Sequence, residues 1–185
     1  MDRPAPSPAA TMWPDDPSSR DVVIGLGNPL MGDDATGLVA LERLRAEWDL
    51  PGDVELVDGG TWGMSLMPVI EQARRVLFLD AITTGAVAGT VVELARRDLP
   101  RRLSLNMSPH QVDLREVLAL IALRGTLPGE AAAIGVEPAR VELGEPLSAP
   151  VSAAMDAMVQ GAIARLRAWG HECRPRAASG AFADA

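Results

Sequence analysis

The chain has 185 residues, of which 48% are hydrophobic, so it is long enough for one domain with a complete core. Its formal net charge is −8, which argues against nucleic acid or an anionic membrane as the main partner, because either would select a basic surface. No apolar run approaches the roughly 20 residues of a membrane span. Since the single cysteine, Cys173, cannot form an internal disulfide, a reducing cytoplasm is the expected compartment.

The two ends of the chain are predicted to be tails. Residues 1–20 contain five prolines and no apolar segment of the signal-peptide kind, so we expect a disordered lead. Residues 171–185 are polar and rich in alanine, and we expect them to be disordered as well, with His171 exposed to solvent. The folded domain is therefore predicted to span residues 21–170.

The first predicted strand begins at Val22 and ends in a glycine turn, Gly25-Leu26-Gly27-Asn28-Pro29-Leu30-Met31-Gly32-Asp33-Asp34. A helical pattern follows at once. One helix start needs at most one capping acid, so either Asp33 or Asp34 is surplus to that structure and is a candidate for chemistry. The third glycine of a dinucleotide-binding loop is missing, and two acids would repel a pyrophosphate, which disfavours nucleotide binding.

Further strands are predicted from short apolar runs. Each is followed by polar residues or lies at an edge: Val54–Val57 before Asp58-Gly59-Gly60-Thr61, Val76–Leu79 before Asp80, Thr90–Leu94 as an edge or antiparallel strand, and Ala131–Val136 before Glu137-Pro138. Helical spacing predicts a helix from Leu114 to Ile121, after Ser108-Pro109-His110, and another from Val151 to Leu166 that is closed by Gly170.

This alternation of strands and helices predicts a single three-layer α/β domain, a twisted and mostly parallel sheet of about five strands with helices on both faces. The carboxyl ends of parallel strands meet at one edge, where ligands bind in open α/β sheets. The acids after the strands should therefore collect there.

The sequence places a candidate metal site at this edge. Asp80 directly follows an apolar strand and should be partly removed from water, although a lone aspartate there more often caps a helix or accepts loop N–H groups. His110 lies at a predicted helix start, which favours the neutral imidazole that binds metals. Two carboxylates and one imidazole would suit Ni²⁺ or Zn²⁺ with positions left open, but these residues lie far apart in the sequence.

Five segments, in chain order, resemble the hydrogenase maturation endopeptidases, the family that finishes assembly of the large subunit of nickel-iron hydrogenase. They are Gly25 to Asp34, Asp58-Gly59-Gly60-Thr61, Asp80-Ala81, Ser108-Pro109-His110-Gln111 and Gly135-Val136-Glu137-Pro138. The resemblance runs from about Val22 to about Arg167. It implies a phosphorylase/hydrolase-like fold.

The resemblance also implies roles for individual residues. The family's metal ligands correspond to Asp34, Asp80 and His110, and its first acid is glutamate in some members and aspartate in others. Asp34 and Asp80 are the candidate catalytic acids, and either could be the general base. The candidates for substrate recognition are Gly27, Asn28, Asp58, Gly59, Gly60 and Thr61.

The implied activity is removal of a C-terminal extension from the large-subunit precursor after nickel insertion. The nickel would come with the substrate, although zinc or cadmium would also fit the site. Specificity is expected in the loops at residues 96–107 and 125–130. Two alternatives are a non-catalytic nickel-binding chaperone and a peptidyl-tRNA hydrolase. The latter shares the opening Gly-Leu-Gly-Asn-Pro but expects a histidine-bearing segment where this chain has Gly32-Asp33-Asp34, and an acidic chain suits tRNA poorly.

Overall fold

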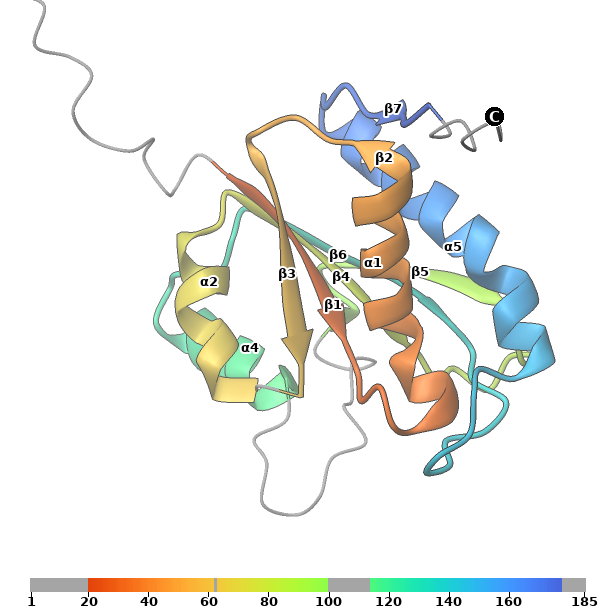
Figure 1. The fold of residues 1–185 in the computed structure, drawn as a ribbon. Helices are drawn as coiled ribbons and strands as arrows, with labels where there is room; N and C mark the ends of the chain where they lie inside the picture. Colours follow the sequence, from red (N-terminus) through yellow and green to blue (C-terminus); the bar gives the residue numbers. More distant parts are fainter. Residues whose placement is uncertain (1–19, 62, 100–113, 178–185) are drawn as a thin grey trace, which may run out of the picture.

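A five-stranded sheet forms the centre of the molecule, which a computed structural model describes for residues 20–61, 63–99 and 114–177 (Figure 1). The strand order is β3-β1-β4-β6-β5; the first four strands are parallel and β5 is antiparallel to β6. The strands are β1 (Asp21–Leu26), β3 (Val54–Gly60), β4 (Arg75–Ala81), β5 (Val91–Ala95) and β6 (Glu130–Val136). This arrangement confirms the predicted α/β class and the predicted edge position of the strand near Thr90–Leu94.

Helices cover both faces of the sheet, as predicted (Figure 1). On one face lie α1 (Thr36–Glu47) and α5 (Ala149–Ala168), and on the other lie α2 (Met67–Gln72) and α4 (Leu114–Leu123). The side chains of β4 alternate between the two cores: Leu77 and Leu79 pack with α1 and α5, whereas Val76 and Phe78 pack with α2 and α4. All four are fully buried, which confirms Val76–Leu79 as the central strand.

The chain turns sharply from β1 into α1 at the carboxyl edge of the sheet. A 3₁₀ turn, η2 (Gly32–Ala35), leads directly into the helix. A Cβ placed on Gly37 would lie 2.1 Å from the carbonyl oxygen of Leu79 and 2.5 Å from that of Leu26. Only glycine permits this approach, so Gly37 lets the start of α1 rest on the ends of β1 and β4.

The segment after α5 is ordered against the body of the domain. Residues Arg174–Pro175 form β7, which pairs antiparallel with β2 (Trp48–Asp49). The side chains of His171 and Cys173 are buried. The prediction that His171 is solvated is therefore wrong, and the predicted tail begins too early, because residues 171–177 bind back to the domain. Residues 178–185, and residues 1–19 of the lead predicted at 1–20, lie outside the described residues.

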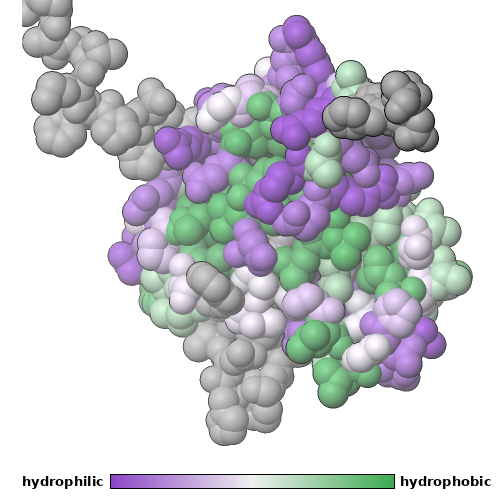
Figure 2. Space-filling model, viewed as in Figure 1, coloured by the Kyte–Doolittle hydropathy of each residue, from purple (hydrophilic) through white to green (hydrophobic). Residues whose placement is uncertain are grey.

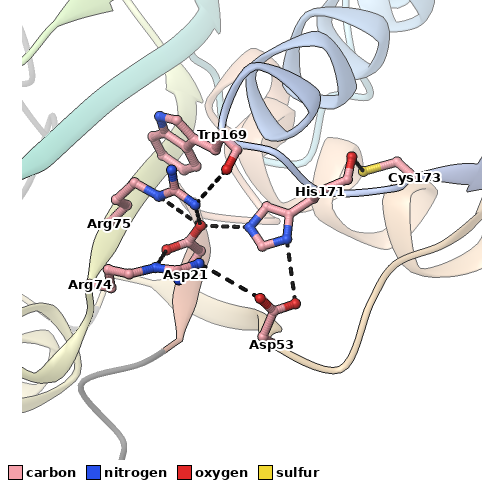
Figure 3. A network of polar contacts seen from close by, with 7 residues as sticks. All are labelled: Asp21, Asp53, Arg74, Arg75, Trp169, His171 and Cys173. Atoms are coloured by element: carbon pink, nitrogen blue, oxygen red, sulfur yellow. Dashed lines mark hydrogen bonds and ion pairs between the residues drawn. The ribbon is translucent and has the colours of Figure 1, made fainter.

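The segment is held by a polar network at the amino-terminal edge of the sheet, opposite the edge where the acids were expected (Figure 3). His171 Nε2 lies 2.6 Å from Asp21 Oδ2, and Arg74 and Arg75 each donate to the same carboxylate from their Nε atoms at 2.8 Å. The Arg75 guanidinium also lies over the Trp169 ring, 5.1 Å from its centroid. In the part of the chain that the structure describes, no helix has both the length and the apolar character to cross a membrane.

Candidate active site

Asp33 has a structural role. It is fully buried and accepts hydrogen bonds from the backbone N–H groups of Ala139 (2.8 Å), Arg140 (3.0 Å) and Ser148 (2.6 Å) and from the Ser148 hydroxyl (2.8 Å). Burial alone would raise the pKa of Asp33, but these donors outweigh it and lower the pKa. Its carboxylate thus ties η2 to the loop after β6 and to the start of α5, rather than capping its own helix.

Asp34 is the surplus acid. Its side chain is buried, with 9% exposed, and its Oδ2 accepts one hydrogen bond, from the backbone N–H of Asn28 at 2.8 Å. Burial raises the pKa of Asp34, and the Asn28 N–H offsets that effect only in part. A buried carboxylate with few hydrogen-bond donors is stabilised by a nearby cation. The two adjacent aspartates therefore have different environments and different uses.

Asp80 lies on the neighbouring strand end. It is 2% exposed in β4, and its Oδ1 accepts a hydrogen bond from the Ala81 N–H at 2.8 Å. Because β1 pairs with β4 and η2 contacts β4, the turn that carries Asp34 lies at the strand end that carries Asp80. The fold thus brings the two predicted acids to the same edge of the sheet.

The third predicted ligand, His110, lies outside the described residues. Across residues 20–61, 63–99 and 114–177, no three His, Cys, Asp or Glu side chains form a group that could hold a metal ion. Asp34 and Asp80 supply only carboxylate oxygens, which is an incomplete donor set for nickel. A metal site made from these residues therefore needs further donors, and the role of His110 stays a prediction.

The predicted recognition residues gather where β1 and β3 end. Gly27 adopts a φ of 117° and donates its N–H to the Gly60 carbonyl at 3.0 Å, while a β-bulge places Gly59 under the Ile24 side chain. Asn28 Oδ1 accepts the Leu30 N–H at 3.0 Å, which fixes the turn.

Two more of the predicted recognition residues lie beside these strand ends. Asp58 is exposed and Thr61 is half-buried. Their place at the edge is established, whereas their contact with a substrate stays a prediction. Of the expected specificity loops, residues 125–130 are described, and residues 100–107 lie outside the described part.

Glu137 organises the same edge, and the sequence interpretation gave it no role. It is 5% exposed and accepts hydrogen bonds from the Thr84 N–H (2.6 Å), the Thr84 hydroxyl (2.7 Å) and the Gly85 N–H (3.2 Å). Burial alone would raise the pKa of Glu137, but these donors lower it overall. Glu137 therefore fixes the loop that follows Asp80. Its place directly after a buried strand was the available signal.

Comparisons with known proteins point to one family. The hydrogenase maturation protease family model matches residues 39–165. The chain is 36% identical over 155 residues to the hydrogenase expression/formation protein HupD of Rhodobacter capsulatus, covering 83% of this chain and 74% of HupD. It is 34% identical over 160 residues to the hydrogenase 2 maturation protease of Escherichia coli, covering 86% of this chain and 98% of that relative.

Solved structures give the same result. The hydrogenase maturating endopeptidase HybD of E. coli matches with a TM-score of 0.79 and 33% identity, covering 85% of this chain and 98% of HybD. The nickel-iron hydrogenase maturation protease HycI of Thermococcus kodakarensis matches with a TM-score of 0.64 and 26% identity, covering 80% and 93% of the two chains.

The fold, with two buried acids at the carboxyl edge of its sheet, is that of an α/β peptidase. This chain belongs to the hydrogenase maturation protease family. The family assignment replaces the peptidyl-tRNA hydrolase alternative.

Proposed function

We propose that this peptidase removes a C-terminal extension from the large-subunit precursor of a nickel-iron hydrogenase once nickel has been inserted. The observation that carries the proposal is that Asp34, in η2, and Asp80, near the end of β4, are both buried at the same edge of the sheet, while Asp33 is the acid held by the hydrogen bonds to Ser148. At this turn Asp33 holds the loop after β6 and the start of α5, so Asp34 is available for chemistry.

Nickel enters this proposal as part of the substrate. Asp34, Asp80 and His110 would add two oxygens and one imidazole nitrogen to a centre that the precursor already holds through softer ligands. The nickel would polarise the scissile carbonyl. One of the two aspartates would take the proton from the attacking water, and either can do so if it lies within hydrogen-bond reach of that water. Water adds across the peptide bond, so the products are a new carboxyl end and a released peptide.

The proposal is tested by incubating the purified chain with nickel-loaded and nickel-free precursor and following the mass of the large subunit. We expect the loaded precursor alone to lose its extension. Binding of the loaded precursor without any loss of mass would indicate a non-catalytic nickel-binding chaperone instead. Equal cleavage of both forms would show that nickel is not the recognition element.

The roles of the three residues are tested by Asp34→Asn, Asp80→Asn and His110→Ala. Each should abolish processing while the thermal midpoint stays within a few degrees of the parent, because each residue is assigned to binding and chemistry. Asn keeps the shape of the side chain but removes its negative charge. Glu130→Gln is the control, because Glu130 is an exposed acid at the start of β6, at the opposite edge of the sheet. Full processing by one of the three variants would remove that residue from the site.

A further inference from the structure

A groove runs along α1 on the side that faces β3. Its volume is about 600 Å³, and apolar side chains line most of it, including Pro29, Ala35, Leu38 and Val39. This side of the molecule is the one seen in Figure 2, where hydrophobic side chains are exposed among charged ones around α1 and β3. The volume is in the range of sites that hold a small ligand or a few side chains of a peptide.

The groove continues directly from the candidate active site. Pro29 follows Asn28, whose N–H binds Asp34, and Ala35 follows Asp34 in the chain. Asp58, in the segment expected to recognise substrate, also lines the groove. A peptide bound with its scissile bond near Asp34 would therefore have this apolar surface within reach of the residues that flank the bond.

The charged side chains of the groove indicate which charge a bound peptide would carry beside its apolar residues. Arg43 is already paired, with Glu47 and with Asp156, each at 2.7 Å, and Glu42 is paired with Arg45. Within residues 20–61, 63–99 and 114–177, Asp58 has no ion pair or hydrogen bond through its side chain. The groove thus presents one uncompensated acid, in a chain whose net charge is already −8. A basic side chain is the complement to such a surface.

We propose that this groove binds an apolar segment of the precursor next to the cleaved bond, with a basic side chain of that segment facing Asp58. This inference rests on the proposed function, and it adds a docking surface that is separate from the acids that carry the reaction. It assigns α1 a role in substrate affinity rather than in the chemical step.

The test replaces Leu38 with glutamate, which puts a charge into the groove without changing Asp34, Asp80 or His110. Leu123→Glu is the matched control, because Leu123 is 84% exposed at the end of α4, on the opposite face of the sheet. We expect Leu38→Glu to raise the KM for nickel-loaded precursor about tenfold, with kcat changed less than about twofold. Asp58→Asn should raise KM by a smaller factor, and Leu123→Glu should leave both constants unchanged.

Two further measurements keep the outcome decisive. If Leu38→Glu lowers the thermal midpoint, Ala46→Glu takes its place, because Ala46 lines the groove and is exposed on the last turn of α1. Direct binding of the nickel-loaded precursor, measured by calorimetry, separates this inference from the proposed function. If wild type binds the precursor without cleaving it, and Leu38→Glu weakens that binding, the docking surface is supported and the proposed peptidase activity is rejected.

An unchanged KM and an unchanged affinity in a folded Leu38→Glu or Ala46→Glu chain would overturn the inference. So would a wild-type dimer in solution that either substitution dissociates, since that result would assign the groove to a second copy of the chain.

Discussion

Asp21 and His171 lie 150 residues apart in the sequence, yet Asp21 Oδ2 and His171 Nε2 are 2.6 Å apart. Asp21 is the first residue of β1, and His171 follows the end of α5. The contact joins the start of the central sheet to the segment after the last helix. Because Asp21 is fully buried and accepts from Arg74 and Arg75 as well, the carboxylate is the centre of an ionic cluster at the edge away from the active site (Figure 3).

This cluster predicts how stability depends on acid. Burial alone would raise the pKa of Asp21, but hydrogen bonds from Arg74, Arg75 and His171 lower it from 3.8 to about 2. A lowered pKa in the folded state stabilises the fold above the unfolded value of 3.8, and this contribution is lost as the pH falls through about 2. By linkage it is worth about 2 kcal/mol.

Urea unfolding of wild type and of Asp21→Asn over that pH range tests the prediction. The difference in unfolding free energy between the two chains should shrink as the pH falls from about 4 to about 2. Glu142→Gln, at an exposed acid, serves as the control and should follow the wild-type curve. A difference that stays constant across the range would mean that the Asp21 carboxylate gains nothing from its partners.

The sequence predicted the sheet well and this cluster not at all, for a physical reason. An apolar run such as Val76–Leu79 predicts a buried strand because the signal lies in consecutive residues of the sequence. The burial of His171 instead depends on Asp21 and on the packing of Trp169 and Cys173 against the core, which no local pattern encodes. A polar segment with little apolar periodicity was therefore predicted to be disordered.

A second prediction separates the two adjacent aspartates. Asp33→Asn should lower the free energy of unfolding by about 1–3 kcal/mol, because an amide NH₂ would face buried N–H donors from the segment Ala139–Ser148. Asp34→Asn should leave stability unchanged or slightly higher, because burial disfavours the ionised carboxylate there and raises its pKa. Processing should show the opposite order, with Asp34→Asn inactive and the folded fraction of Asp33→Asn active.

Denaturant unfolding and the precursor mass assay are run on both variants. Asp33→Asn should lose stability and keep activity, and Asp34→Asn should keep stability and lose activity. A stable Asp33→Asn chain would contradict the structural role of Asp33. The sequence alone left the choice between these acids open, and the family resemblance selected Asp34. The structure supplies the reason, since Ser148, the chief partner of Asp33, lies 115 residues further along the chain.

A third prediction concerns the strand that carries Asp80. Leu79→Ala should lower the free energy of unfolding by about 2–5 kcal/mol, because Leu79 is fully buried between β4 and the helices α1 and α5, and the substitution leaves a cavity. Leu123→Ala, at an exposed site, should change it by less than about 0.5 kcal/mol. Urea midpoints measure both. Processing by the folded fraction of Leu79→Ala should match wild type; a lower rate in fully folded protein would show that Leu79 also positions Asp80.

The last prediction concerns the order of events. Free nickel added to the protease should not restore cleavage of a precursor whose metal-binding thiols have been replaced by serine. The reason is the donor set: the proposed site offers two carboxylates, from Asp34 and Asp80, and one imidazole, from His110, which leaves the coordination of nickel incomplete. Such a set holds nickel weakly, whereas thiolates of the substrate would hold it firmly.

The measurement is the mass of the large subunit after incubation of wild-type and serine-substituted precursor, each with and without added nickel. Wild-type precursor loaded with nickel should be cut, and the serine-substituted precursor should stay intact at every nickel concentration that leaves the protease folded. Cleavage of the substituted precursor on addition of nickel would show that the protease holds the metal by itself, and Asp34→Asn would then have to abolish nickel binding in the absence of any precursor.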